Sequence, residues 1–468
     1  MFHRLAFLIT FLSLHLQAQS IGNAQKIWES SSGAASWRGI VINLVRAGYP
    51  FSALPFMKNY LIQNRSAIDN ELDEVFEDLI AATGIRPFET LPDNVLGQSR
   101  SSVVRYILAK KHFRKARWSQ ALEEVQRVNA NHSIYPYAVH LKAAIHSIQG
   151  KNQEARSDYQ DCINYSRSRS NGESNLAKRN QMLANRDMCL AGLARTAFNI
   201  KDHAAADLLY LDIPKSSPVW PTILFEEAWN SYYLNNYNRT LGKLVSYKAP
   251  VFDFIFNPEI EILKALSYLK LCLYNDVNKT AEDFFSQNMA PAKSLRQFIV
   301  SHGSDYNYYY KLATSYEQNK VAKDLLIQNI LQSIVKDQAW IEMRAAYLQA
   351  MLEFGKIRDA GSSRFNIALM TNIKEVVGHY QILLGSYAQS QFQEKYNQLS
   401  TSLQDMSYIK LEVLSRKKQS LYESKSLEGK RGDIRYIDRN EKQYFWDFDG
   451  EFWADELGDY VFALGSEC

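Results

Sequence analysis

The sequence predicts an all-α fold, built as a solenoid of stacked helical pairs, and three observations support this prediction. Small residues recur 34 positions apart, at Ala121 and Ala155 and again at Ala206 and Thr240, and Ala53 lies two periods before Ala121. Glycine and proline, which interrupt helices, are scarce, with 20 and 11 among 468 residues. Hydrophobic residues make up 46% of the chain, which is enough for a folded protein. A period of 34 residues is typical of helix–turn–helix units that bury a core by stacking.

The first 18 residues have the features of a secretory signal peptide. His3 and Arg4 precede an apolar run from Leu5 to Leu16, and cleavage is expected after Ala18. The run is too short to cross a bilayer, which requires about 20 apolar residues, and no other segment is apolar enough to do so. We therefore expect an exported protein without a transmembrane segment in its mature chain. A buried N-terminal helix is the alternative.

The charge balance gives no indication of a nucleic-acid or anionic membrane partner. The formal charge is only +4, from 54 basic and 50 acidic residues, and broad electrostatic attraction requires a larger excess. Two basic runs, within residues 110–117 and 416–418, are expected on solvated helix faces.

Four cysteines are present, and export permits disulfides. Cys162 and Cys189 lie in neighbouring helical segments on either side of the polar stretch "SRSRSNGESN". We predict a disulfide between them, with buried free thiols as the alternative. Cys272 and Cys468 have no predicted partner, and no spacing is that of a zinc site.

Residues 19–290 are predicted to form the repeat domain. Its first hairpin turns near Gly48 and Pro50, and the next period reaches Pro87, which indicates a degenerate unit because proline is excluded from helix interiors. Three further units carry residues of matching kind: Ala109, Trp118 and Ala121; Ala143, Gly150, Ala155 and Tyr159; Gly192, Ala206, Tyr210 and Pro218. These spacings match the tetratricopeptide pattern, with a generic helical bundle as the alternative. The polar stretch from Arg167 to Asn175 is expected to be a surface loop.

Residues 291–428 are predicted to form long antiparallel helices, hairpin-like or coiled-coil-like. Pro291 is the last proline of the chain, and apolar residues beyond it recur three and four positions apart. One stripe consists of Leu399, Leu403, Met406, Ile409, Val413 and Leu414. Burial of this stripe within the protein is favoured over a partner groove.

Residues 429–468 form a tail in which aromatic and acidic residues alternate. The aromatic residues are Tyr444, Phe445, Trp446, Phe448, Phe452, Trp453, Tyr460 and Phe462. A free tail would expose their apolar area, about 150–250 Å² for each ring. We expect the tail to dock on the helical scaffold and to close the array.

No catalytic, cofactor or metal motif is found in the sequence, so no catalytic residue, cofactor or metal ligand is predicted. His112 is expected to be a packed or surface residue. The acidic cluster of the tail is Asp447, Asp449, Glu451, Asp455, Glu456 and Asp459. Its "DFDGE" start differs from a calcium loop, because the glycine stands at position 4 where that loop needs it at position 6. Calcium binding and paired carboxylates acting on a glycan remain alternatives to a simply solvated tail.

Two stretches resemble tetratricopeptide-repeat envelope proteins of gliding and predatory delta-proteobacteria. The first carries Trp220, Glu227, Ala228, Trp229, Tyr232, Leu241, Gly242, Ala249, Pro250, Pro258, Glu259, Leu271 and Cys272. The second is similar to that family's C-terminal signature, at Phe445, Trp446, Phe448, Asp449, Gly450, Glu451, Trp453, Asp455, Glu456, Leu457, Gly458, Tyr460, Ser466 and Cys468. The resemblance implies a non-enzymatic protein of the periplasm or cell envelope of a Gram-negative bacterium, associated in some members with adventurous gliding motility. No lipid-acceptor cysteine follows the apolar run here, unlike in the lipoprotein members.

These observations predict an exported scaffold that binds a protein partner through a tetratricopeptide-type groove. Aromatic residues on inner helix faces are the expected anchors, namely Tyr106, Trp229, Tyr232 and Tyr233. The alternative function is an envelope enzyme or regulator that acts on or senses peptidoglycan through tail carboxylates such as Glu451 and Asp455.

Overall fold

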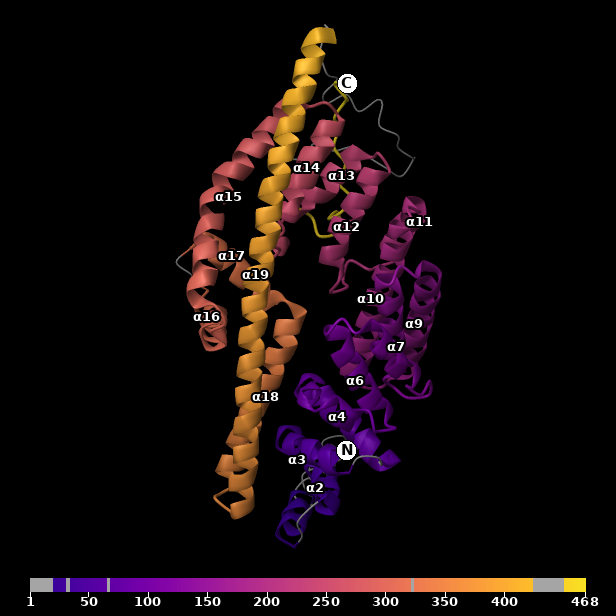
Figure 1. Ribbon diagram of the computed structural model, residues 1–468, viewed down its shortest axis with the longest axis vertical. Coiled ribbons are helices and arrows are strands. Elements are labelled where there is room, and N and C mark those ends of the chain that lie inside the picture. Colours follow the sequence, from indigo (N-terminus) through magenta and orange to yellow (C-terminus); the bar gives the residue numbers. More distant parts are fainter. Residues whose placement is uncertain (1–19, 31–33, 65–67, 321–323, 424–449) are drawn as a thin grey trace, which may run out of the picture. The chain divides into compact units, whose positions relative to one another are not determined.

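The computed structural model describes residues 20–30, 34–64, 68–320, 324–423 and 450–468, and within these ranges all regular structure is helical (Figure 1). The all-α prediction is therefore confirmed. No helix of the described ranges is both long and apolar enough to cross a lipid bilayer. The predicted signal peptide, residues 1–18, lies outside the described residues.

Helices and short turns alternate along the whole described chain, beginning with helical residues 20–30. In chain order follow α2 (Ala34–Arg46), α3 (Pro50–Gln63), α4 (Asn70–Thr83), the 3-10 helix η1 (Arg86–Thr90), α5 (Asp93–Leu96), α6 (Ser102–Arg114), α7 (Trp118–Gln126), α8 (Tyr135–Ile148), α9 (Asn152–Gly172), α10 (Leu176–Asn199), α11 (His203–Leu211), α12 (Trp220–Tyr233), α13 (Tyr237–Val245), η2 (Ser246–Lys248), η3 (Pro250–Phe252), α14 (Glu259–Lys270), α15 (Tyr274–His302), α16 (Tyr306–Asn319), α17 (Leu325–Lys336), α18 (Gln338–Asp359) and α19 (Arg364–Glu423).

The chain divides into two compact units that are discontinuous in sequence. The first comprises residues 1–185 and 339–384, and the second comprises residues 186–338 and 385–468. This division differs from the predicted one, in which residues 19–290 formed a single repeat domain. The predicted boundary at Pro291 lies inside the continuous helix α15. The order of segments along the chain does not reveal that α18 and part of α19 pack against N-terminal repeats.

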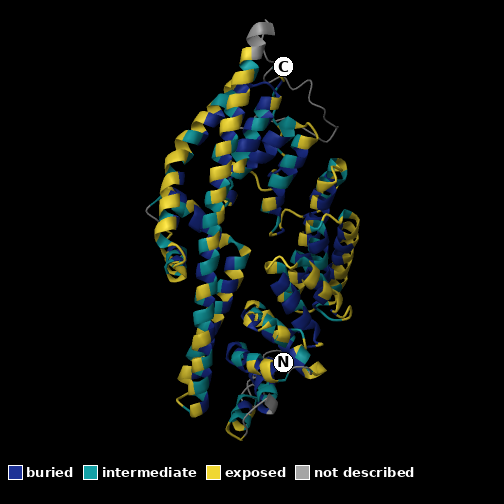
Figure 2. Ribbon diagram, viewed as in Figure 1, coloured by how far each residue is buried: buried dark blue, intermediate teal, exposed yellow. Residues whose placement is uncertain are grey.

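The predicted 34-residue period appears in the structure as small residues where paired helices cross. Ala53, Ala121, Ala155, Ala206 and Thr240 are all fully buried. Each is near the start of the second helix of a pair, where a larger side chain would hold the two helices apart. Buried positions accordingly follow the helix faces that meet within a pair (Figure 2).

The turns of these pairs share one hydrogen-bonding pattern. In each, a residue with positive φ donates its N–H to the carbonyl three residues before it, and the next residue donates to the carbonyl five residues before itself, which is the Schellman motif. The positive-φ residues are Gly48, Ala116, Gly150, Lys201, Asn235 and Cys272, with φ from 54° to 83°. The first five precede a buried small residue by five positions.

Exchanging side chains at two of these turns should change stability in opposite directions. Lys201 and Gly150 have φ values of 65° and 71°, where a Cβ is disfavoured by about 1–2 kcal/mol. We expect Lys201→Gly to raise the free energy of unfolding by up to about 1 kcal/mol and Gly150→Ala to lower it by about 1 kcal/mol. Urea denaturation followed by circular dichroism measures both, and changes of equal sign would contradict the assignment of these turns.

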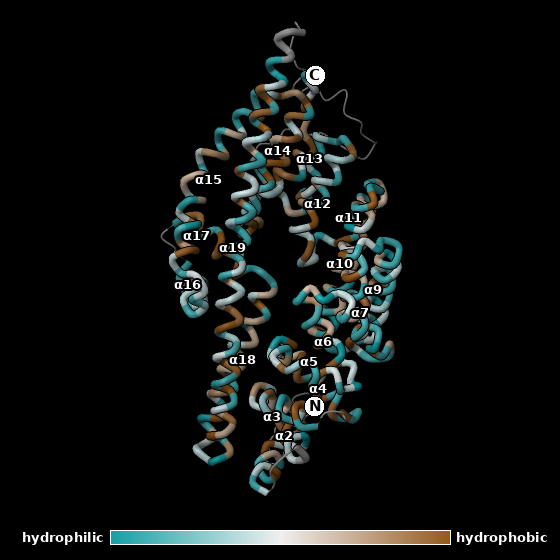
Figure 3. The backbone as a smooth tube through the Cα atoms, viewed as in Figure 1, coloured by the Kyte–Doolittle hydropathy of each residue, from teal (hydrophilic) through white to brown (hydrophobic). Residues whose placement is uncertain are grey.

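Two local predictions are wrong. Most of the predicted surface loop, residues 167–175, is helical, because α9 continues to Gly172 and only residues 173–175 lie outside a helix, although Figure 3 shows α9 as largely hydrophilic. Ser166 and Ser170 are small enough to be buried, and the Asn185 Nδ2 atom donates to the Ser166 Oγ atom over 3.0 Å. The basic run near residue 110 is not simply solvated either. Lys111 is buried and lies 2.6 Å from the Asp93 carboxylate, which the remodelled turn after α4 supplies.

Within the first unit, α18 and residues 364–384 of α19 pack against α2–α4. The buried Glu353 carboxylate of α18 accepts hydrogen bonds from the first turn of α3, at 3.1 Å from Phe51 N, 2.7 Å from Ser52 N and 2.6 Å from Ser52 Oγ. These bonds satisfy N–H groups that a helix start leaves unpaired. Tyr380 of α19 donates its hydroxyl to the Thr83 carbonyl at the end of α4.

Glu353 should give the protein a measurable pH dependence. Burial raises the pKa of its carboxyl to about 7, against the ordinary 4.5, and the bonds from Ser52 and Phe51 counteract only part of this rise. Between these two values the folded state binds more protons than the unfolded state, so stability falls as pH rises and levels off above about pH 7. We expect Glu353→Gln to remove on the order of 2 kcal/mol of that fall. Parallel stability curves for the two proteins between about pH 4.5 and 8 would contradict this role.

In the second unit, the apolar stripe of α19 is buried as predicted at four of its six residues, while Leu403 is only partly buried and Leu414 is exposed. Leu399, Met406, Ile409 and Val413 are at most 6% exposed, whereas Leu414 is 57% exposed. Positions 399, 402, 406, 409 and 413 follow the three-and-four spacing of one helix face, and residue 414 lies about 100° further around the helix. The buried stripe forms part of the core of this unit.

Candidate protein-interaction site

Aromatic side chains from two successive helical pairs form a connected cluster in the second unit. We call it the aromatic face; it consists of Phe198, His203, Trp229, Tyr232, Tyr233 and Tyr237. The ring of Tyr233 stacks on that of His203 with centroids 5.1 Å apart and an interplanar angle of 4°. Its centroid lies 5.9 Å from that of Trp229. The rings therefore hold one another in fixed orientations.

Hydrogen bonds to two polar residues, buried Asn230 and exposed Glu259, hold His203 and Trp229 of the aromatic face in place. The fully buried Asn230 Nδ2 donates to the His203 carbonyl over 2.9 Å, and Asn230 Oδ1 lies 3.1 Å from the His203 ring nitrogen Nδ1. Trp229 Nε1 donates to a Glu259 carboxylate oxygen over 3.1 Å. Burial raises the pKa of the Glu259 carboxyl, while the bond from Trp229 opposes that rise.

The four predicted anchors differ in what they offer a partner. Trp229 and Tyr232 pack partly against the cluster of Ala228, Leu244 and Leu263, whereas Tyr233 is 51% exposed. Tyr106 belongs to the first unit, where it packs half-buried among residues of α6–α8 and burial raises the pKa of its hydroxyl. The structure therefore brings three of the four residues together and leaves Tyr233 as the most accessible of them.

A fully buried ion pair joins α12 to α13 behind this face. The Lys243 ammonium contacts the Glu227 carboxylate, and the two side chains are 2% and 6% exposed. Charges in such an apolar setting are tolerated only as a pair, because either one alone would be left without solvation. Lys243 directly follows Gly242, the residue at which the C-terminal tail crosses α13.

The described part of the tail, residues 450–468, docks on α12–α14 and the turn into α15. We call the residues that hold it the tail seat: Trp220, Leu224, Asn238, Leu241, Gly242, Ser246, Leu271, Cys272 and Leu273. At Gly242 the main chain of the tail passes so close that a Cβ atom would lie 1.7 Å from the Tyr460 carbonyl oxygen. Only glycine permits this approach. The predicted docking of the tail is confirmed for these residues.

Main-chain atoms of the tail supply most of its polar contacts. Asn238 Nδ2 donates to the Leu464 carbonyl over 3.1 Å, and Leu464 N donates to Asn238 Oδ1 over 3.0 Å. Phe462 N donates to the Asn238 carbonyl over 3.1 Å, and Gly458 N donates to the buried Ser246 Oγ over 2.9 Å. The side chains of Phe462 and Leu464 pack against Leu241, Leu271 and Leu273.

A disulfide between Cys272 and Cys468 ties the end of the tail to the turn between α14 and α15. This pair could not be predicted from the sequence, because a separation of 196 residues carries no pairing signal. Both cysteines of the predicted pair, Cys162 and Cys189, are disulfide-bonded as well. No described cysteine is free.

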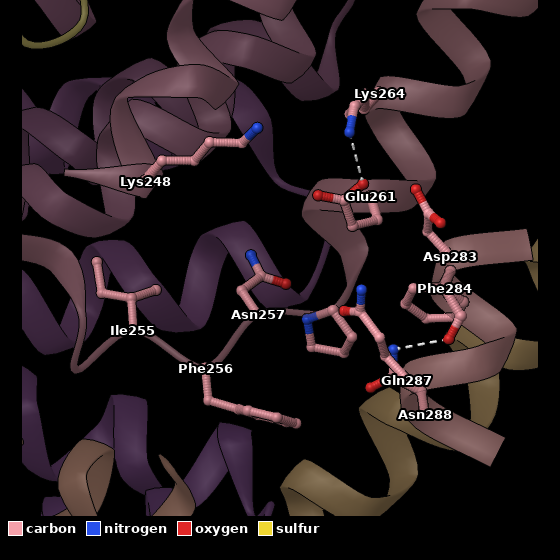
Figure 4. A pocket seen from close by; sticks show the side chains of 11 residues that line it. Lys248, Ile255, Phe256, Asn257, Glu261, Lys264, Asp283, Phe284, Gln287 and Asn288 are labelled. Carbon is pink, nitrogen blue, oxygen red and sulfur yellow. Dashed lines mark hydrogen bonds and ion pairs between the residues drawn. The ribbon is translucent and has the colours of Figure 1, made fainter. Parts of the chain in front are cut away.

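Beside the tail lies an open groove with two adjoining hollows of about 450 and 380 Å³. Lys248, Ile255, Asn257, Glu261 and Lys264 line both hollows, and Phe462 of the tail lines the smaller one. Figure 4 shows Lys264 paired with Glu261 from α14, with the Asp283 carboxylate of α15 on the same side. The groove therefore has apolar walls and charged groups of both signs. It lies next to the docked C-terminal tail.

The described carboxylates of the tail do not lie together at one site. Glu451 and Asp455 are exposed, and the Asp459 carboxylate pairs with Lys215 Nζ over 2.9 Å. Asp447 and Asp449 lie outside the described residues. Among the residues that are described, no group of three or more metal-binding side chains is found. The candidate calcium and glycan chemistry of this cluster therefore gains no geometric support.

His112 occupies a packed position, one of the two that the sequence suggested. It is 6% exposed, and burial lowers the pKa of its imidazole. His112 therefore belongs to the packed interior on α6.

Comparison with known proteins adds little to this picture. No family model matches the sequence, and no curated protein matches it. Among solved structures, the chain is similar to one described as a circular tandem repeat protein with novel repeat topology and enhanced subunit contact surfaces. The identity is 14%, the match covers 84% of this chain and 78% of that chain, and the TM-score is 0.16. At so low a TM-score the likeness supports no argument about this protein.

Proposed function

We propose that this protein is a non-enzymatic scaffold that binds a protein partner, and the aromatic face of the second unit is the observation that carries the proposal. Rigid aromatic side chains with fixed orientations are the residue type that dominates binding energy at protein interfaces. Tyr233 remains half-exposed although it lies between His203 and Trp229. Because the ring is already held in one orientation, its side chain loses less conformational entropy when a partner binds.

The proposed location is the cell envelope, outside the cytoplasm. Four disulfide-bonded cysteines support an oxidising compartment, and the apolar N-terminal run supports export. The resemblance to envelope proteins of gliding bacteria favours a complex associated with motility or the cell surface. These three lines of support are independent of the aromatic face.

Substitution of Tyr233 tests the proposed function. We expect Tyr233→Ala to reduce capture of envelope proteins at least tenfold, because the most accessible anchor of the face is lost, while the thermal transition stays within about 2 °C of the wild type. Quantitative mass spectrometry of proteins retained on the immobilised full chain measures the capture.

Leu208→Ala serves as the matched control, because Leu208 is 68% exposed on α11 and makes none of the ring contacts of the aromatic face. Proteins that the wild type and Leu208→Ala retain and Tyr233→Ala loses would be partners of this face. Equal retention by all three proteins would exclude the aromatic face as the binding surface.

A further inference from the structure

The contacts that hold the tail on the tail seat are of the kinds that hold a bound peptide on a protein. Its recognition uses main-chain N–H and C=O groups at Gly458, Phe462, Leu464 and Glu467, the last donating to the Leu271 carbonyl over 2.9 Å. Side chains two residues apart, Phe462 and Leu464, enter the same apolar cluster, which is the arrangement of an extended segment. Proteins recognise extended peptides by this combination of main-chain hydrogen bonds and alternating side-chain pockets.

We propose that the tail seat is a peptide-binding site, which the chain fills with its own C-terminus and which in trans accepts an extended segment of a partner protein. This inference deepens the proposed scaffold function and rests on it. The ligand class is a polypeptide with the pattern Gly-Asp-x-x-aromatic-x-aliphatic, as in residues 458–464.

Each position of that pattern has a structural reason. Gly458 has a φ of +88°, and a Cβ there would lie 3.1 Å from Leu224 Cδ1. The following carboxylate, Asp459, pairs with Lys215 over 2.9 Å. The aromatic and aliphatic positions fill the space that Phe462 and Leu464 occupy against Leu241 and its neighbours.

Asn238 is the centre of the site. Its carboxamide bonds both the N–H and the C=O of Leu464, and a carboxamide is the side chain that can satisfy both groups of one residue at once. These bonds do not depend on which side chain residue 464 carries, so they would hold a foreign segment equally well. Tyr233 makes none of these contacts and does not belong to the apolar cluster of the tail seat, although Tyr237 of the aromatic face packs against that cluster.

The chain's own tail competes with any foreign segment. A ligand on the same chain has an effective concentration in the millimolar range, and the Cys272–Cys468 disulfide keeps it near the seat. The wild-type protein should therefore bind a trans peptide weakly. A protein whose own tail has lost its anchors should bind the same peptide more tightly.

A fluorescein-labelled peptide of residues 454–467, added to full-length protein and followed by fluorescence anisotropy, tests this inference. The variant Phe462→Ala/Leu464→Ala/Cys468→Ser removes the anchors of the cis tail, and we expect it to bind the peptide at least tenfold more tightly than the wild type. Adding Asn238→Ala to that variant should abolish the binding, because it removes both bonds to Leu464. If the triple variant does not fold, Leu464→Ala alone should give at least a threefold gain.

The control is the same peptide with alanine at the positions of Phe462 and Leu464. Binding of the native peptide that is no tighter than binding of this control, to a tail variant with an unchanged helical circular dichroism spectrum, would overturn the inference. So would binding that survives Asn238→Ala. Neither result bears on the aromatic face, because capture through that face is measured separately with Tyr233→Ala.

Discussion

Gly242→Ala should release the C-terminal tail from α13. The added Cβ would lie 1.7 Å from the Tyr460 carbonyl oxygen, 2.2 Å from its carbon and 2.7 Å from Val461 N. These are main-chain atoms, which no rotamer change can remove, so the tail has to leave its position. Loss of the apolar contacts of Phe462 and Leu464 and of the hydrogen bonds made at Gly458, Phe462 and Leu464 should lower the free energy of unfolding of the second unit by about 2–4 kcal/mol.

Hydrogen exchange of the full chain measures this release. In the wild type the Phe462 and Leu464 amides donate to Asn238 and should be protected, whereas in Gly242→Ala they should exchange at least tenfold faster. Gly378→Ala is the control, because a Cβ at that helical glycine meets nothing within 4 Å. It should be neutral or slightly stabilising. Unchanged protection of the two amides in Gly242→Ala would contradict the docking.

Lys243→Met should be the most destabilising of the charge substitutions. It removes one partner of the buried pair and leaves the Glu227 carboxylate without a counter-charge in the core between α12 and α13. Such a change costs about 3–5 kcal/mol. The double variant Glu227→Leu/Lys243→Met replaces both charges by apolar groups and should recover at least half of that loss.

Urea denaturation of the single and double variants measures this coupling. Lys264→Met provides the matched control, because Lys264 forms its ion pair with Glu261 at a partly exposed position and should lose less than about 1 kcal/mol. A cost for Lys243→Met as small as that of the control would contradict the buried pair. A double variant no more stable than the single one would do the same.

Features that depend on local packing rules could be predicted from the sequence. The 34-residue beat follows from the close crossing of paired helices, so the spacing alone was enough to assign Ala121 and Ala206 to helix crossings. The turn near Gly48 was predicted from the sequence as well. Ala116, Lys201 and Cys272 adopt the same left-handed conformation, although their residue types do not favour it. At these positions the packing of the two flanking helices outweighs the preference of residues with a Cβ for negative φ.

The docking of the tail was predicted, but the individual residues that meet in distant contacts could not be. The sequence neighbours of Gly242 do not reveal that residue 460 passes over it. Neither the Cys272–Cys468 pair nor the capping of α3 by Glu353 leaves a spacing signal, because both join segments about 200 to 300 residues apart. The two stretches that carry the family resemblance are the two sides of the tail contact, since Gly242 and Cys272 come from the first and Tyr460 and Cys468 from the second.

The seated tail is the most direct sign that the second unit holds polypeptide, and disulfide mapping tests it in one measurement. The full-length protein, purified without reductant and digested at acidic pH to prevent disulfide exchange, should yield a cross-linked peptide pair containing Cys272 and Cys468. That pair should disappear on reduction. A free Cys468, or a Cys272 joined to Cys162 or Cys189, would contradict the account.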